Sequence, residues 1–443
     1  MLSPEDNEIL CRVGSGTPMG ELLRRFWLPA VLASELPGPD SDPLRLRILG
    51  EDLVAFRDTE GKIGILDAYC PHKLANMYWG RNEECGLRCA YHGWKFDTAG
   101  NCVDVANEPD SENLKRKIKI KSYPVIEQGA LVWIYMCPRA DPPGLPHLEW
   151  AHVPADQIHM TRWLQSSNWA QGFEGEIDSS HISFLHRTMD RRGRLPTVST
   201  SRPSDEYWDA TPSLTLKETD YGFVYGARRS AGEAEYYWRT TQWYLPMYSM
   251  IANDQYPRSG RAWVPVDDHH VITFSYNYDA EKPLSQEIRD IMEAATSFPP
   301  RLTQGSFMLP DDAVIDTFLP DAHKGNDYLI DRGIQRTGNY SGIRGLNEQD
   351  RAVQESMISV PGLGPGKIVD RSKEYLASAD VPVITARRML VELAKALRDG
   401  TEPAIVDNPA AYAVRTISPI SETADFETLL REHEGEDQAI VPM

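Results

Sequence analysis

Hydrophobic and polar positions change their period along this chain, and the change predicts where one kind of structure gives way to another. Near the N-terminus, helical patterns run over 3–10 and 20–27, and a Pro- and Gly-rich linker follows at 37–43. Beyond it, apolar residues alternate with polar ones in short runs separated by Gly and Asp turns, which predicts strands. These runs cover 44–49, 53–57, 63–66, 117–121 and 130–135. Such a series is typical of a small all-β domain.

The remainder of the chain, after a second Pro-rich linker at 138–146, mixes both periods. Strand-like stretches come first and helical patterns follow, an order that indicates an α+β domain. We therefore expect N-terminal helices over 1–38 that pack on the larger domain, a small all-β domain over 39–146 and the larger domain over 147–443. The strand-like stretches are 213–227, 235–243 and 261–278, and the helical patterns are 285–296, 348–358 and 385–397.

Composition narrows the class of protein rather than its fold. Of 443 residues, 41% are hydrophobic and 25% are charged, which is ordinary for a folded globular chain. The longest apolar runs, such as 130–137, are far short of the roughly 18–20 residues that a membrane span needs, so we expect no membrane association. The net charge of −19 would repel nucleic acid. The first residues lack a basic segment followed by an apolar one, so we expect a cytoplasmic protein.

Two cysteines and two histidines form the first group with the chemistry of a metal site. One residue separates Cys70 from His72, and two residues separate Cys89 from His92. Each half is a short loop that places a thiolate beside an imidazole, so two facing loops supply four ligands for zinc or for an iron–sulfur cluster. Zinc fingers pair Cys with Cys and His with His, whereas here each half carries one of each. That arrangement suits a two-iron cluster in which one iron takes both cysteines and the other takes both histidines.

Asp178, His181 and His186 form a second group further along the chain. Asp178 and His181 are three apart, so we expect them to share one face of a helix, and the chain must bend before His186 for both imidazoles to reach one point. Two histidines and one carboxylate occupy one face of an octahedral Fe(II) and leave positions open for O2 and substrate. Alone, both histidines could equally be ordinary surface or core residues. The cluster motif favours the metal interpretation, because a one-electron donor needs a centre that consumes electrons.

The two motifs together resemble those of the oxygenase (alpha) subunits of Rieske non-haem iron oxygenases. The first matches Cys-x-His and Cys-x2-His with 91–97 as its flank, and the second matches the family's Asp/Glu-x2-His-x4-His pattern. Lys73, where the phthalate 4,5-dioxygenase branch usually has Arg, departs from the pattern outside the ligand positions. The segments that look like this branch are 1–33, 263–268 and 348–380. The likeness therefore spans nearly the whole chain.

The resemblance implies a Rieske [2Fe-2S] cluster on the first motif and a mononuclear Fe(II) on His181 and His186. The third iron ligand must be a carboxylate from a distant segment, and spacing alone does not choose it. In the family it lies on a late helix with a Glu five residues on, which fits Asp350 and Glu355. An exposed acid in the first turn of a helix is the alternative. The carboxylates considered are Asp311, Asp312, Asp316, Asp321, Asp327 and Asp350.

Two further residues receive roles in binding or electron transfer. In the family, the carboxylate that matches Asp178 bridges a cluster histidine of one subunit and an iron-ligand histidine of its neighbour. The resemblance thus implies a bridge from Asp178 to its own His181 and to the residue equivalent to His92 on the next subunit. Arg239 lies among aromatic residues of a strand-like stretch, where it could bind the carboxylate of an aromatic substrate bidentately. An exposed position on the strand is the alternative for Arg239.

The resemblance also implies an activity and its partners. We expect a terminal oxygenase with a helix-grip catalytic domain, in which helices cover an antiparallel sheet. It would hydroxylate an aromatic substrate with O2 and with electrons from NAD(P)H, delivered by a separate reductase or ferredoxin, since no dinucleotide-binding fingerprint is visible. Dihydroxylation of an aromatic carboxylate is expected on the likeness to the phthalate branch alone. A monooxygenase or O-demethylase acting on an aryl ether, a Rieske electron-transfer protein and a zinc-binding scaffold stay open. Because each active site would use a neighbour's cluster, we expect a homotrimer or a dimer of trimers.

Overall fold

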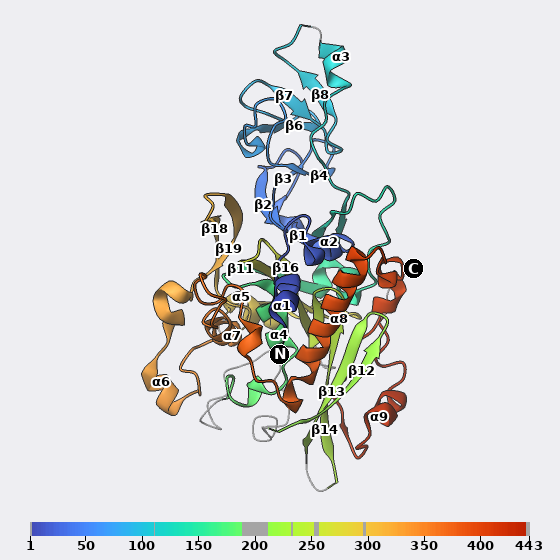
Figure 1. The fold of residues 1–443 in the computed structure, drawn as a ribbon, viewed down its shortest axis with the longest axis vertical. Coiled ribbons are helices and arrows are strands. Elements are labelled where there is room, and N and C mark those ends of the chain that lie inside the picture. Colours follow the sequence, from blue (N-terminus) through green and yellow to red (C-terminus); the bar gives the residue numbers. More distant parts are fainter. Residues whose placement is uncertain are drawn as a thin grey trace.

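The computed structural model describes residues 2–109, 111–187, 211–231, 234–251, 257–295 and 298–439. Figure 1 shows an elongated molecule in which a small lobe built from strands stands above a larger lobe of helices and strands. One cluster of buried apolar side chains lies within the small lobe, and a larger cluster fills the large lobe and continues into the small lobe at Leu46, Leu53 and Ile65. The architecture is therefore α+β, as the sequence predicts.

The small lobe contains two antiparallel sheets. Its core gathers Val54, Leu66, Leu87 and Phe96, one or more residues from most of its strands. Short strands suffice because most of them contribute one or two inward side chains to this core. The first sheet contains β2 (Leu44–Ile48), β3 (Glu51–Arg57) and β4 (Ile63–Asp67). The second contains β5 (Arg81–Glu83), β6 (Gly86–Arg88), β7 (Trp94–Phe96) and β8 (Cys102–Val105), with helix α3 (Ser111–Lys115) beyond it.

The strand predicted over 117–121 does not form. Its backbone bonds to two different segments in turn, because Ile120 N–H donates to Gly100 O and Lys121 O accepts from Asp67 N–H. Since Gly100 and Asp67 belong to separate parts of the lobe, no continuous ladder develops. Ile120 still turns into the core and is 4% exposed. The alternation of apolar and polar residues therefore predicts correctly which side chain is buried, but its prediction of strand pairing is wrong.

The N-terminal residues begin as helices and then join a sheet. α1 (Pro4–Cys11) and α2 (Pro18–Arg24) each start behind a hydroxyl side chain that accepts a backbone N–H of the first turn. The helical pattern predicted as far as 27 ends earlier, because the chain extends into β1 (Trp27–Leu32), which is buried throughout. β1 pairs with β10 (Leu131–Tyr135), and β9 (Val125–Gln128) completes the sheet. Segments far apart in sequence thus meet between the lobes.

An eight-stranded antiparallel sheet is the centre of the large lobe. Its strands run in the order β11-β17-β16-β15-β14-β13-β12, and the short β20 pairs with β14. The bounds are β11 (Ile158–Gln165), β12 (Ser213–Thr219), β13 (Gly222–Ser230), β14 (Tyr236–Tyr244), β15 (Tyr248–Ile251), β16 (Arg258–Pro265), β17 (Val271–Tyr278) and β20 (Ile420–Ser421). A separate hairpin, β18 (Leu302–Met308) and β19 (Val314–Pro320), reaches the small lobe beside β2.

The two faces of the large sheet meet different helices of the large lobe. These helices are α4 (Trp169–Glu176), α5 (Gln286–Ala294), α6 (Arg332–Thr337), α7 (Leu346–Gln354), α8 (Val381–Arg398) and α9 (Phe426–Glu432). On the outer face of β14, Trp238 stacks on Phe426 of α9 and Thr240 Oγ1 donates to Ile417 O at 2.8 Å. The inner face lies toward helices α4 and α7. In the part of the chain that the structure describes, none of the helices has the length and apolar character to cross a membrane.

Two glycines let α4 lie close to its neighbours. A Cβ at Gly172 would come within 2.4 Å of the Trp263 ring on β16, and a Cβ at Gly175 within 2.3 Å of the Gln354 amide on α7. Both contacts are far inside van der Waals distance. At Gly172 several atoms of the Trp263 ring would be met, which favours glycine there, whereas at Gly175 the end of the flexible Gln354 side chain would have to shift. The segment that follows α4 is therefore held between the inner face of the sheet and α7.

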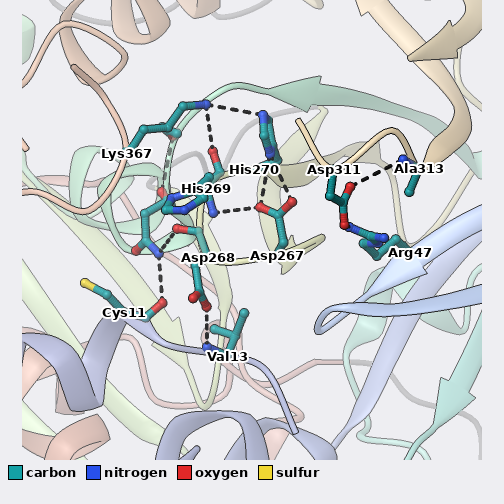
Figure 2. A network of polar contacts seen from close by, with 12 residues as sticks. Cys11, Val13, Arg47, Asp267, Asp268, His269, His270, Asp311, Ala313 and Lys367 are labelled. Atoms are coloured by element: carbon teal, nitrogen blue, oxygen red, sulfur yellow. Dashed lines mark hydrogen bonds and ion pairs between the residues drawn. The ribbon is translucent and has the colours of Figure 1, made fainter. Parts of the chain in front are cut away.

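A network of polar side chains fixes the turn between β16 and β17 (Figure 2). Asn168, the N-cap of α4, donates to Cys11 O at 2.9 Å and to Asp268 O at 2.8 Å. The His270 ring lies between Asp267 and Lys367, with Nδ1 3.0 Å from Asp267 Oδ1 and Nε2 3.2 Å from Lys367 Nζ. We call Asn168, Asp267, Asp268, His270 and Lys367 the polar junction. It ties together α1, α4 and the β16–β17 turn.

Candidate metal centres

Three side chains from two distant segments meet beside the inner face of the large sheet. His181 and His186 follow α4, whereas Asp350 belongs to α7. The two histidine Nε2 atoms are 3.1 Å apart, and Asp350 Oδ1 lies 3.6 Å from His181 Nε2 and 3.2 Å from His186 Nε2. One possible ligand atom of each residue lies within 4.8 Å of the others, a spacing that fits a single metal ion.

Gln349 fixes the orientation of His186, a role that no motif in the sequence indicates. Its Oε1 lies 2.6 Å from His186 Nδ1, while its Nε2 donates to Ile343 O at 2.8 Å. Because the amide donates elsewhere, its oxygen faces the imidazole and favours a proton on Nδ1. The Nε2 lone pair is then free to bind a metal. Gln349 directly precedes Asp350 in α7, so one helix turn supplies a candidate ligand and the support of another.

Asp178 stands in the same relation to His181. Its Oδ2 is 3.5 Å from His181 Nδ1, on the side of the ring away from Asp350. Burial opposes ionisation of Asp178, but hydrogen bonding with His181 and Ser180 lowers its pKa to about 2. Burial likewise opposes the charged form of His181, but Asp178 and Asp350 outweigh it and raise the His181 pKa. Asp178 is thus a carboxylate that orients and polarises the imidazole.

The helix face predicted for Asp178 and His181 is wrong. α4 ends at Glu176, and His181–Ser183 forms only a single 3-10 turn. The physical reason lies in Asp178 itself, whose Oδ1 accepts from the backbone N–H of Ser180 at 2.7 Å. This local turn competes with continuation of the helix. The bend predicted before His186 is present, and it brings both imidazoles to one point.

Asp350 lies where a third ligand would be needed. Burial alone would raise its pKa, but His186, His181 and the positive charge of Arg261 together lower it. The side chain is therefore ionised, which is the state that binds a metal.

Other carboxylates considered from the sequence have different partners. Asp316 Oδ1 pairs with Arg45 Nη2 at 2.7 Å, and Asp311 Oδ2 pairs with Arg47 Nη1 at 2.8 Å. These two pairs tie the β18–β19 hairpin to the small lobe. Asp321 Oδ1 accepts from Thr303 Oγ1 at 3.0 Å. Of the six carboxylates considered, only Asp350 joins His181 and His186 within the described residues.

The Cys/His motif occupies two facing loops of the small lobe. Cys70 and His72 follow β4, while Cys89 and His92 lie between β6 and β7. The centroids of the His72 and His92 rings are 4.5 Å apart. A backbone bond closes each loop, from Leu74 N–H to Cys70 O at 2.9 Å in the first and from Gly93 N–H to Cys89 O at 3.0 Å in the second. The loops therefore bring two thiols and two imidazoles together.

The chemistry of this donor set fits an iron–sulfur cluster. Both thiols are buried and neither is in a disulfide. Burial and the adjacent Cys89 raise the pKa of Cys70 to about 11, so a positively charged metal centre would be needed to hold it as a thiolate. His72 stacks on Trp94 with 4.4 Å between ring centroids, and its buried Nδ1 has no hydrogen-bond partner in the described structure. A metal ligated by these residues would satisfy both features.

Arg239 lies on the inner face of β14 rather than at the surface. It is 6% exposed, so the alternative expectation of an exposed arginine on the strand is wrong. Its Nη1 is 3.5 Å from Ser179 Oγ, in the segment that leads to His181. Its positive charge is close enough to oppose protonation of His181. The structure therefore places a buried guanidinium next to the histidine pair.

Comparisons with known proteins assign a family to each lobe. Residues 26–124 match the model of the Rieske [2Fe-2S] domain, and residues 134–430 match that of the LigXa C-terminal domain like family. The chain is 36% identical to the oxygenase subunit of 3-chlorobenzoate-3,4-dioxygenase from Comamonas testosteroni, over 93% of each chain. It is 34% identical to the oxygenase subunit of phthalate 4,5-dioxygenase from Pseudomonas putida, over 94% of this chain and 92% of the relative.

A solved structure of similar fold is that of dicamba monooxygenase bound to dicamba. Its TM-score is 0.57 at 17% identity, and the match covers 85% of this chain and 98% of the other. At this identity the likeness concerns the fold, a small all-β domain joined to a larger mixed domain.

Proposed function

The chain belongs to the Rieske non-haem iron oxygenases as a terminal oxygenase subunit, and from this premise we propose that it hydroxylates an aromatic carboxylate. Its cofactors are a Rieske [2Fe-2S] cluster and a mononuclear iron. The observation that carries the proposal is the meeting of His181, His186 and Asp350 beside the buried guanidinium of Arg239. Electrons would come from NAD(P)H through a separate reductase, since the relatives are oxygenase subunits of larger systems.

We assign the cofactors to specific side chains. Cys70, His72, Cys89 and His92 would hold the cluster, and His181, His186 and Asp350 would hold the iron. When bound, these groups would supply one-electron transfer and the activation of O2 for insertion into the substrate. The protein contributes the orientation: Gln349 and Asp178 each face the Nδ1 side of one imidazole. Both Nε2 atoms are thereby directed at one point, and three ligands leave other positions of the iron open.

We propose that Asp178 carries the electron path between neighbouring subunits. Figure 1 places β6 and β7 at the far end of the small lobe and α4 and α7 in the large lobe, so one chain keeps its two sites apart. The loops that present the cluster histidines are rimmed by exposed apolar residues, namely Leu74, Trp79 and Tyr91 at 72%, 70% and 61% exposure. Such a rim suits burial against another subunit. A homotrimer or a dimer of trimers would then complete each active site.

The same assignment gives each lobe one cofactor. We propose that residues 39–146 form the cluster-bearing domain and 147–443 the iron-bearing domain, with the helices of 1–38 packed on the latter. β1 connects these parts, because it belongs to residues 1–38 and pairs with β10 of the cluster-bearing domain.

Arg239 supports the choice of substrate class. A guanidinium binds a carboxylate bidentately and retains its charge when buried. Two similar proteins are named for 3-chlorobenzoate and phthalate, both of which are aromatic carboxylates. We therefore propose that Arg239 binds the carboxylate while the ring lies toward His181 and His186.

Product analysis with ¹⁸O-labelled O2 tests the proposed function. The purified protein, a reductase and NADH would be offered benzoates, phthalates, aryl ethers and unsubstituted arenes. We expect labelled diols or phenols from the acids only, and Arg239→Met should raise KM for them about 10–100-fold. Equal turnover of acids and neutral arenes would contradict the proposal, as would an unchanged KM in Arg239→Met.

A further inference from the structure

The inner face of the large sheet is more polar than a face that packs on helices needs to be. Thr241 on β14 lies opposite Tyr225 on β13, and Ser249, Arg261 and Ser275 lie opposite one another on β15, β16 and β17. All five are buried. The hydroxyl oxygens of Ser249 and Ser275 have no hydrogen-bond partner within the described ranges. An unsatisfied buried polar atom is unfavourable, so this face is suited to a polar molecule.

Glu176 and Arg261 are the charged members of this region. Glu176 ends α4, Arg261 projects from β16, and Arg261 Nη1 donates to Glu176 Oε2. Their side chains are 6% and 10% exposed. The Arg261 guanidinium also lies 5.1 Å from the centroid of the Phe298 ring. A buried ion pair of this kind has opposite charges in contact, so its net charge is zero.

Each member of the pair keeps one polar atom that binds nothing else in the described structure. Arg261 Nε is a buried donor without an acceptor, and Glu176 Oε1 is a buried acceptor without a donor. Glu176 comes two positions before Asp178 in the chain, and the positive charge of Arg261 helps to lower the pKa of Asp350. One buried donor and one buried acceptor are therefore left open on two residues whose charged groups are in contact.

We propose that Glu176 and Arg261 form a subsite for a hydroxyl group on the substrate ring, an inference that rests on the proposed function for the presence of substrate beside His181 and His186. A hydroxyl donates to Glu176 Oε1 and accepts from Arg261 Nε, so it satisfies both atoms. A second carboxylate would meet the charge of Glu176, and a methoxy group has no proton for it. The subsite therefore selects a hydroxylated aromatic over its unsubstituted or dicarboxylated counterpart.

Equilibrium binding tests this subsite without turnover. Calorimetry under anaerobic, non-reducing conditions would compare benzoate with its three hydroxybenzoates and methoxybenzene with its three methoxyphenols. For at least one ring position, the wild-type protein should bind the hydroxylated compound about tenfold or more tightly than its parent. Glu176→Leu removes the acceptor and Arg261→Lys removes the Nε donor, so in both variants this ratio should approach one. Arg258→Lys is the matched control, because Arg258 lies on the same strand and donates to Thr416 O at 3.1 Å.

Each outcome decides between the two proposals. If no ring position gives tighter binding of the hydroxylated compound, or if the ratio persists in both variants, the subsite is refuted. Tighter binding of benzoates that depends on Arg239 but not on a hydroxyl would leave the carboxylate proposal standing alone. A ratio that appears among the methoxyphenols, and vanishes in both variants while benzoates fail to bind, would support the subsite and refute the carboxylate. Because the ratio is measured within each protein, a general loss of stability does not imitate it.

Discussion

Two groups of histidine and aspartate lie in the large lobe, and they are arranged in opposite ways. In the polar junction, Asp267 and His270 are nearly adjacent in sequence, and the His270 ring lies between a carboxylate and the Lys367 amine. At the proposed metal site, His181 and His186 come from one segment and Asp350 from a distant one, and their electron-pair donors point at one another. The junction satisfies its own polar atoms, whereas the metal site brings together atoms that need a cation.

This difference shows what distinguishes a metal site from a structural network of the same residues. In the junction each imidazole nitrogen of His270 faces a charged protein group, and nothing is left to bind. At the metal site the outward nitrogens, both Nδ1, face Asp178 and Gln349, and the inward Nε2 atoms are 3.1 Å apart. Supporting contacts on one side and convergence on the other are the signature of ligation.

Replacing Asp350 should give the largest effect and separate the two groups most sharply. Asp350→Ala removes the only carboxylate among the three converging residues, so we expect loss of the mononuclear iron and of turnover. The Rieske signal in electron paramagnetic resonance should persist, because the cluster lies in the other lobe. His270→Ala is the matched control and should keep the cluster, the mononuclear iron and most activity. Retained product formation in Asp350→Ala would overturn the ligand assignment.

Asp178→Asn should slow electron delivery without removing metal. The amide keeps the shape of Asp178 but loses the charge that raises the His181 pKa, and supporting residues of this kind contribute about 10–100-fold to activity. Rapid-mixing measurements would follow reoxidation of the reduced cluster in a single turnover. Asp267→Asn in the polar junction provides the comparison and should leave that rate unchanged. Equal rates in both variants would remove Asp178 from the electron path.

Gln349→Leu should weaken the iron site less than loss of a ligand does. The change removes the acceptor 2.6 Å from His186 Nδ1, so the ring loses its fixed orientation while its nitrogen stays available. We expect iron affinity to fall about tenfold, measured by competition with a chelator. Gln349→Glu restores an acceptor and should recover most of the affinity. If Leu and Glu behave alike, the contact with His186 is not what matters.

The parts of this picture that the sequence predicts are the local ones. Spacing within two short loops predicts the ligand group Cys70, His72, Cys89 and His92. The five-residue spacing of His181 and His186 likewise predicts the bend that brings them together. The choice of Asp350 needed the family likeness, because nothing local separates it from the other carboxylates on the later part of the chain.

The features that the sequence does not predict depend on how distant segments pack against each other. Gln349 reaches His186 only because α7 lies beside the segment after α4. The Glu176–Arg261 pair depends on how α4 lies over β16. The helix predicted through Asp178 failed because its own side chain binds the Ser180 backbone, a competition that periodicity does not register.

A change in the polar junction should affect stability and leave catalysis intact. Asp268→Ala removes the acceptor of the Val13 N–H at 2.9 Å and leaves this buried donor unpaired. The free energy of unfolding should fall by about 1–3 kcal/mol. Thermal melting followed by Trp fluorescence would show a lower midpoint, and turnover below the transition should match the wild type. A large loss of turnover at full folding would mean that the junction takes part in catalysis.

The smallest effect concerns acid sensitivity of the same region. Burial lowers the pKa of His269, assisted by the neighbouring Lys367 and His270 and opposed by Asp267 and Asp268. Below the ordinary histidine value of about 6.5, the unfolded chain binds a proton that folded His269 resists, so the free energy of unfolding falls as pH falls toward the folded pKa. Removing this proton site in His269→Gln should reduce the shift of the melting midpoint between about pH 7 and about pH 5. An identical shift in variant and wild type would show that the turn accommodates a protonated His269 without loss of stability. The junction would then accept a positive charge, as the proposed metal site does, although its own polar atoms are already hydrogen-bonded.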